Sequence, residues 1–205
     1  MKDVEKYLYS AYCVGLVAMN LLASKQVDIS VFTINLGLFI FPMVFTIINI
    51  QSDVFGFKRA KNMITTGLVV NIVMAVIYVI AINVPPSRNF VNQEAFQIVL
   101  GSTTRISIAS IIAYYIGSLI NAKIQTSLKK KFERYLFFRL ITSSAIGHIV
   151  DNVLFMMLAF LGVLPIMAII TMIIGGTIIG VVYEIAIFPG TRMFIKRLRE
   201  HQREI

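Results

Sequence analysis

The feature that most constrains this chain is the recurrence of apolar runs long enough to cross a lipid bilayer. A transmembrane helix needs about 20 consecutive, mostly apolar residues, and such runs recur from Tyr7 to Phe194. Six runs and their short connections account for nearly all of the 205 residues. We therefore expect an all-α integral membrane protein, with a single transmembrane domain over residues 1–205 formed by a bundle of six helices. The expected spans are residues 7–24, 35–51, 62–84, 96–122, 136–161 and 165–190.

The composition argues against a water-soluble domain. Charged residues make up 14% of the chain, hydrophobic residues 58%, and the mean hydropathy is +0.82. Soluble proteins carry roughly 25% charged residues, so an ordinary polar surface cannot be built from this sequence. The single cysteine, Cys13, excludes an internal disulfide and lies in an apolar run, where we expect it to pack as a small core residue.

The net charge of +9 would suit a nucleic-acid partner, but the distribution of basic residues indicates membrane topology instead. Fifteen Lys or Arg residues lie before the first span, after the second and fourth, and after the sixth. The alternate connections hold two, Lys25 and Arg88. The positive-inside rule then places both termini in the cytoplasm. We expect a lipid bilayer as partner and no nucleic acid.

The first apolar run follows Lys2 and Lys6, as in a secretory signal peptide. The segment with small residues that follows this run, Leu22–Lys25, is a weak cleavage site, and five further spans follow. We interpret the run as a retained first helix. The expected location is the bacterial cytoplasmic (inner) membrane, as a multi-pass protein.

The fifth expected span carries the densest group of polar residues. Polar groups inside a span cost free energy and normally face a cavity or one another. Helical spacing puts five residues on one face: Ser144, His148, Asp151, Asn152 and Phe155. At 1.5 Å per residue, Asp151 lies roughly 18 Å along the helix from Arg139, near the middle of the bilayer. The stripe is suited to binding a small polar molecule; alternatively, His148 and Asp151 pair and join two helices.

Two other spans repeat this pattern. One face of the second span holds Asn35, Pro42, Thr46, Asn49 and Asp53. Pro42 is expected to kink that helix, and Asp53 either lines the cavity or is an interfacial acid. One face of the fourth span holds Ser110, Tyr114, Gly117 and Asn121. Arg105 points about 140° away from Ser110 on an ideal helix. Either the helix bends near residues 101–104, or Arg105 serves another surface.

The sixth span is rich in glycine at Gly175, Gly176 and Gly180. Such residues usually permit close helix approach, and a hinge is the alternative. Glu184 is expected to be interfacial, because ~19 residues from Pro165 nearly cross a bilayer.

Signatures of several catalytic chemistries are missing. The chain has no glycine-rich phosphate loop followed by lysine, no CxxC or HExxH spacing and no GxSxG motif. It also lacks the TVGYG filter of potassium channels. We expect a protein that binds a small molecule, without catalytic residues, metal or cofactor.

Several stretches, in this order and spacing, resemble the queuosine-precursor transporter family, also called the putative vitamin uptake family. They are Asn20–Lys25, Phe41–Pro42, Asn49–Gly56, Arg105–Ser110, Ala113–Gly117, Arg139–Phe155 and Phe160–Gly162. The resemblance implies a six-span protein that imports deazaguanine bases used to make queuosine in transfer RNA. The chain departs from the family's pattern at four polar positions, which leaves the exact substrate open: Asn49, Asp53, Ser118 and His148.

The residue types support a planar heterocycle independently. A carboxylate such as Asp151 accepts the ring N–H and exocyclic amine of a guanine-like edge, amides or His148 donate to its carbonyl, and aromatic rings cover its faces. The residues expected to bind substrate are Asn20, Phe45, Asn49, Asp53, Arg105, Tyr114, Ser144, His148, Asp151, Asn152 and Phe155.

Two alternatives from other functional classes stay open from sequence. The chain could be the substrate-binding subunit of an energy-coupling-factor vitamin importer, with the small-residue patch Ala11–Gly15 contacting coupling subunits. It could also be a membrane enzyme with His148 and Asp151 as an acid–base pair. The oligomeric state stays open as well, with a homodimer as one possibility. In a transporter, His148 is either a proton carrier or a neutral donor to the substrate.

Overall fold

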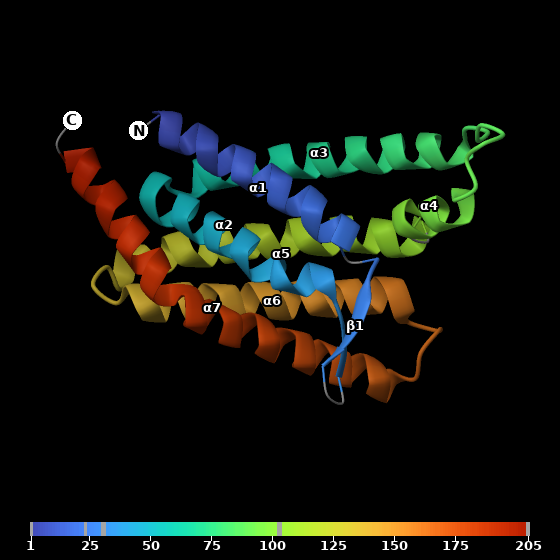
Figure 1. Ribbon diagram of the computed structural model, residues 1–205. Coiled ribbons are helices and arrows are strands. Elements are labelled where there is room, and N and C mark those ends of the chain that lie inside the picture. Colours follow the sequence, from blue (N-terminus) through green and yellow to red (C-terminus); the bar gives the residue numbers. More distant parts are fainter. Residues whose placement is uncertain (1, 23, 30–31, 102–103, 204–205) are drawn as a thin grey trace.

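A computed structural model describes residues 2–22, 24–29, 32–101 and 104–203; within these ranges, only the backbone is described at 2, 26, 28, 29, 32–35, 104–107 and 201–203. Helices dominate the fold (Figure 1). The elements are α1 Lys2–Leu22, β1 Gln26–Ile29, β2 Phe32–Asn35, the 3-10 helix η1 Leu36–Phe39, α2 Phe41–Phe55, α3 Phe57–Asn83, α4 Gln93–Leu100, α5 Thr104–Lys131, α6 Leu136–Phe160 and α7 Ile166–Arg203.

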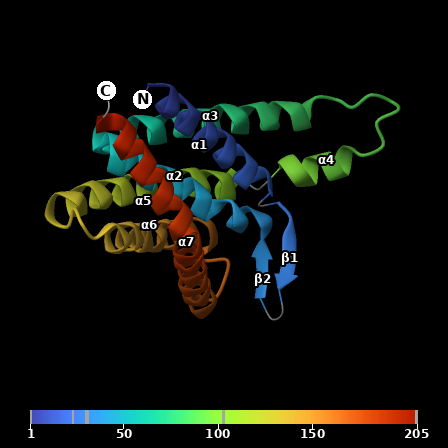
Figure 2. The same ribbon diagram turned by 60° about the vertical axis from the view of Figure 1, so that its left-hand side comes forward.

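Four helical segments of the described chain are long and apolar enough to cross a membrane. They are Leu36–Phe55, Phe57–Asn83, Leu136–Phe160 and Ile166–Glu200. α1 and α5 pack beside them in the same bundle (Figures 1 and 2). Large apolar side chains are exposed on the outer helices, including Val69, Ile72, Val76 and Ile80 on α3 and Ile174, Ile178 and Val182 on α7. Contiguous apolar exposure of this kind suits contact with lipid, and it confirms the prediction of a multi-pass helical membrane protein.

The expected fourth span, residues 96–122, is divided between two helices. α4 ends at Leu100, and α5 begins at Thr104. Gly101 ends α4 by donating its N–H to the Gln97 carbonyl at 2.7 Å. A Cβ on Gly101 would lie 2.4 Å from that carbonyl oxygen, so a larger residue does not fit without movement. α4 therefore ends where the sequence allowed a bend, and the Arg105 side chain that this alternative concerned lies outside the described part of the chain.

Two local features differ from the sequence predictions. Pro42 does not kink a long helix; it lies in the first turn of α2, directly after η1, where its missing N–H is tolerated. The connection between the first two spans contains a two-stranded antiparallel hairpin, with Gln26 paired to Asn35 and Ile29 to Phe32. In Figure 2 the hairpin extends from the end of the bundle where α2 begins.

Glycines set the closest helix contacts. A Cβ on Gly117 of α5 would lie 3.0 Å from the Gly147 carbonyl oxygen of α6, and one on Gly147 would lie 3.3 Å from the Gly117 carbonyl oxygen. A Cβ built on Gly180 of α7 would come similarly close to the His148 ring of α6. Close approach therefore explains Gly180, as predicted, whereas Gly175 has open space around it.

Both termini lie at one end of the bundle (Figure 1). The same end holds the α2–α3 connection and the α5–α6 connection, where Lys58, Arg59 and the run Lys129–Lys131 are found. The clustered basic residues therefore meet at one end of the structure.

Candidate functional site

Polar side chains inside the bundle fall into three levels along the helices, which we call the aromatic layer, the carboxyl layer and the ion-pair layer. The aromatic layer consists of Phe41 and Phe45 on α2, Tyr114 on α5 and His148 on α6. The His148 ring lies 4.4 Å from the Phe45 ring and 5.0 Å from the Phe41 ring, centroid to centroid. Tyr114 packs edge-on against Phe45 at 5.7 Å. These residues make a wall of rings around a buried imidazole.

Several buried polar atoms in and next to the aromatic layer have no hydrogen-bond partner among the described residues. They are both ring nitrogens of His148 and both side-chain amide atoms of Asn121. The hydroxyls of Tyr12, Tyr114 and Ser118 are buried next to them and interact with one another. An unsatisfied buried polar group costs about 1–3 kcal/mol, and native structures contain few of them. Because these atoms are concentrated beside aromatic rings, a polar ligand bound here would supply the largest number of missing hydrogen bonds.

Asp151 and Asn152 lie about one turn beyond His148 on α6. No side chain in the described part of the chain hydrogen-bonds to Asp151, whose neighbour on α5 is Gly117. Asn152 donates to the Thr177 hydroxyl of α7 at 3.2 Å. His148 and Asp151 do not pair with one another, so the interpretation that such a pair joins the helices is wrong.

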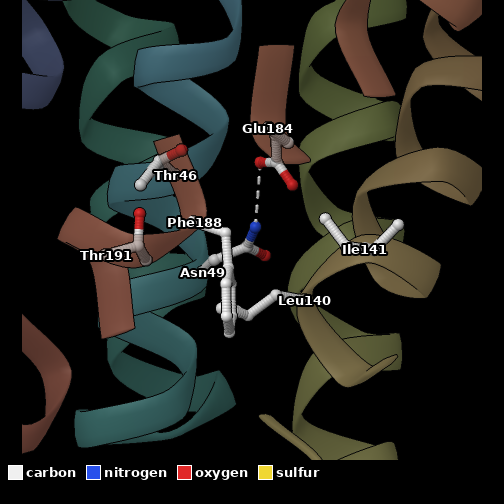
Figure 3. A pocket seen from close by; sticks show the side chains of 7 residues that line it. All are labelled: Thr46, Asn49, Leu140, Ile141, Glu184, Phe188 and Thr191. Atoms are coloured by element: carbon white, nitrogen blue, oxygen red, sulfur yellow. Dashed lines mark hydrogen bonds between the residues drawn. The ribbon is translucent and has the colours of Figure 1, made fainter. Parts of the chain in front are cut away.

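The carboxyl layer lies one turn away, toward the end that holds the termini. The Asn49 amide of α2 donates to Ser144 Oγ of α6 at 2.7 Å and to Glu184 Oε1 of α7 at 3.1 Å. Figure 3 shows Asn49 and Glu184 at a very small pocket of about 10 Å³. Its lining residues are Thr46, Asn49, Leu140, Ile141, Glu184, Phe188 and Thr191.

Glu184 is buried inside the bundle, and its depth in the membrane stays a prediction. Its exposed fraction is 4%, and three helices surround its carboxyl group. Counting residues from Pro165 gives depth only for a helix that starts at the membrane surface and crosses without tilt. α7 is 38 residues long, well beyond the ~20 residues that a bilayer requires, so the count does not fix where Glu184 lies.

The ion-pair layer surrounds Asp53, which is fully buried. Arg139 Nη1 of α6 donates to Asp53 Oδ1 at 2.7 Å, and Arg199 Nη2 of α7 donates to Oδ2 at 2.6 Å. From α5, the Gln125 amide donates to Oδ1 at 3.2 Å, and Lys129 Nζ donates to the Asp53 backbone carbonyl. Asp53 is therefore an ion-paired acid inside the bundle, close to the end of its span. Its carboxylate joins four helices.

Comparison with known proteins identifies the family. The family whose model matches residues 35–194 is described as "Putative vitamin uptake transporter". The chain belongs to this family. A "Probable queuosine precursor transporter" from Bacillus subtilis (strain 168) is 21% identical over 151 residues. That match covers 73% of this chain and 66% of the relative's length, slightly less than two thirds. No solved structure matches the chain. Because the family and the relative are both described as transporters, the prediction that the chain is not an enzyme is supported.

The structure brings together some of the sequence-predicted site residues of this family member. Phe45, Tyr114 and His148 meet in the aromatic layer, with Asp151 and Asn152 beside it, and Asn49 and Ser144 meet in the carboxyl layer.

Four predicted site residues lie elsewhere or outside the description. Asn20 donates to Asn71 Oδ1 on α3 at 2.8 Å, and Phe155 packs against Phe160 at 5.9 Å. Asp53 belongs to the ion-pair layer. The backbone of Arg105 lies in α5, and its side chain is outside the described part of the chain.

Sequence reasoning left several residues of the aromatic and carboxyl layers out of the predicted site: Tyr12, Phe41, Ser118, Asn121 and Glu184. It also did not predict the partners of Asp53 in the ion-pair layer, which are Gln125, Lys129, Arg139 and Arg199. Glu184 carried a usable signal, because an acid within a long apolar run is a functional-site hypothesis by default. Phe41 and Tyr12 are apolar-run aromatics like many others, so no local signal distinguishes them.

Proposed function

We propose that this chain is a membrane transporter that imports a small planar heterocycle, of the deazaguanine class found in queuosine precursors. The observation that carries the proposal is the aromatic layer, where rings and unpartnered polar atoms occur together inside a membrane bundle. Sites for small molecules combine apolar walls with a few convergent polar groups. Membership of a transporter family supports transport, and the name of the Bacillus subtilis relative, a probable queuosine precursor transporter, supports this substrate class.

The chemistry assigns a role to each part of the layer. Phe45 and Tyr114 cover the faces of a flat ring, while the nearby Asp151 carboxylate accepts its N–H groups. His148 and Asn121 supply the donors that a ring carbonyl requires. The rings pack directly on one another, so the substrate enters only when the helices move apart. Such movement around a central site is the general mode of secondary transporters.

Uptake by the purified chain tests the proposal directly. Proteoliposomes that contain only this protein should take up a radiolabelled deazaguanine base, because the site lies within one chain. Excess unlabelled base should compete, whereas an unrelated vitamin such as thiamine should not. Uptake that requires added coupling subunits, or chemically altered base inside the vesicles, would contradict the proposal.

We also propose six spans, with α1 and the α4–α5 segment completing the set and both termini in the cytoplasm of a bacterium. The termini lie at the same end of the bundle, as an even number of crossings requires (Figure 1). The clustered basic residues lie at this end, which the positive-inside rule assigns to the cytoplasm.

Cysteine labelling tests this topology. In a Cys13→Ala background, Ser87→Cys and Ser127→Cys should react with a membrane-impermeant maleimide from opposite sides, since both positions are exposed at opposite ends. Ser87→Cys is expected to react from the periplasm in intact cells, and Ser127→Cys only in inverted vesicles. Reaction of both from one side would mean that a crossing is miscounted.

Substitution of the acid tests the substrate contact. Asp151→Asn keeps the size of the side chain but replaces an acceptor oxygen by a donor, which mismatches the substrate's N–H groups. Binding should weaken by roughly 1–3 kcal/mol, measured by isothermal titration calorimetry on purified protein. Asp3→Asn is the matched control, because Asp3 is 80% exposed and distant from the site. Unchanged affinity in Asp151→Asn would remove this residue from the proposed site.

A further inference from the structure

Glu184 is a buried carboxyl group without a described ion-pair partner. The elements packed against α7 are α6 and α2, and each brings charged or titratable groups near this level. From α2 comes Asp53, and from α6 come Arg139 and His148. The carboxylate of Asp53 takes up both Arg139 and Arg199. His148 lies against Gly180, one turn from Glu184, with its ring enclosed by Phe41 and Phe45.

A charged carboxylate in such surroundings is expensive to bury. An isolated ion transferred into an apolar medium neutralises unless it is paired with an opposite charge. Arg139 and Arg199 form their ion pairs with Asp53, and no described residue forms an ion pair with Glu184. A proton that arrives with the transport cycle is the simplest cation that neutralises this carboxylate directly.

The hydrogen bonds around the pocket suit both protonation states of Glu184. The Thr46 hydroxyl donates to the Pro42 carbonyl at 2.9 Å, and the Thr191 hydroxyl donates to the Ile187 carbonyl at 3.3 Å. Both hydroxyls line the pocket, and a hydroxyl that turns toward Glu184 can donate to its carboxylate or accept from its carboxyl O–H. The ionised carboxylate accepts from Asn49, and the protonated form has hydroxyl oxygens to which its O–H can donate. A group that carries a proton needs partners in both states.

The position of Glu184 links it to the proposed substrate site. Asn49 is one turn from Phe45 on α2, Ser144 one turn from His148 on α6, and Glu184 one turn from Gly180 on α7. Any substrate-driven separation of these three helices therefore changes the Asn49–Ser144–Glu184 contacts as well. From this geometry we infer that Glu184 binds and releases the proton that drives substrate accumulation. This inference rests on the proposed import function and goes beyond it.

The decisive variant is Glu184→Gln, which keeps the shape of the side chain and removes the exchangeable proton. In proteoliposomes with an acidic exterior, the wild type should accumulate labelled deazaguanine base above its external concentration. Glu184→Gln should lose this accumulation yet retain exchange of labelled for unlabelled base. Accumulation at the wild-type level in Glu184→Gln overturns the inference, and so does a loss of exchange together with accumulation. Wild-type protein without uptake or exchange of the base would instead contradict the import function itself.

Two further measurements keep the test informative if Glu184→Gln folds poorly. A pH-sensitive dye inside wild-type vesicles should report acidification when base is added outside, without an imposed gradient. Glu184→Asp, which retains a carboxyl group, should retain that acidification. Absence of a dye response in the wild type, or accumulation driven by a sodium gradient alone, overturns the proton assignment.

The matched control is Glu200→Gln on the same helix. Glu200 is 58% exposed and pairs with Lys196 at the surface. Its replacement removes one acid from α7 without entering the pocket, so accumulation should match that of the wild type. His148→Gln separates the two candidate carriers: if Glu184 carries the proton, gradient-driven accumulation and exchange change together in this variant. Selective loss of accumulation in His148→Gln, with exchange intact, would transfer the role to His148 and overturn the inference.

Discussion

The free energy of unfolding of the Asp53→Asn variant is expected to be about 3–5 kcal/mol lower than that of the wild type. This is the usual loss when one partner of a buried ion pair is removed. Asp53 is the only carboxylate that contacts Arg139 and Arg199 among the described residues, and Arg139 is fully buried. Neutralising Asp53 leaves a guanidinium in a desolvated position. Reversible denaturation of the purified protein in detergent measures the difference.

A surface pair provides the control for this experiment. Asp3 and Lys6 are 80% and 77% exposed, so Asp3→Asn should change stability by less than about 1 kcal/mol. The double variant Asp53→Asn/Arg139→Met removes the stranded charge and should regain part of the lost stability. An Asp53→Asn protein as stable as the Asp3→Asn control would contradict the assigned role of the ion-pair layer.

The ion-pair layer also closes the bundle at the end that holds the termini. It joins α2, α5, α6 and α7 immediately beyond the carboxyl layer, so it separates Glu184 and the aromatic layer from that end. A substrate that leaves through this end must pass where Asp53 contacts its two arginines. The proposed cycle therefore requires these ion pairs to separate, which makes them candidates for the release step as well as for stability.

Apolar periodicity was sufficient to predict most helices, because a membrane leaves few alternatives for a long apolar run. The last residues of α1, α3 and α6 lie within a few residues of the expected positions, whereas α1 and α3 begin earlier than expected. The misses have local causes. The two strands of the hairpin are too short to give a recognisable strand pattern in the sequence. Pro42 lies where a 3-10 helix ends and α2 begins.

The site was harder to predict, because spacing along one helix does not say which neighbouring helix each face meets. Asn49 and Ser144 were each on a polar face, but their contact joins positions 95 residues apart. Asp53 and Arg139 are 86 residues apart, and neither span alone predicts that they pair. Glu184 was left out of the predicted site for the same reason, since its burial follows from packing against α2 and α6.

Gly117→Val is expected to separate α5 from α6 and to lower the free energy of unfolding by about 1–3 kcal/mol, the usual cost of overpacking a tight core. A Cβ at Gly117 would lie 2.9 Å from the Asp151 Cβ and 3.0 Å from the Gly147 carbonyl oxygen. The second contact is with a backbone atom, which cannot move away by a rotamer change as a flexible side chain can. Because the first contact is with Asp151, binding of a deazaguanine base should weaken along with stability.

Gly175→Val is the matched control for Gly117→Val, since both substitutions place the same β-branched side chain inside a long helix of the bundle. Nothing lies within 4 Å of a Cβ built on Gly175, so its variant should keep near-wild-type stability and binding. Parallel denaturation and calorimetry of the two variants measure the difference. Equal losses in both would point to an effect of valine on the helices themselves, whereas a loss confined to Gly117→Val locates it at the α5–α6 contact. That contact holds Asp151 at the edge of the aromatic layer, so its spacing sets both the fold and the proposed site.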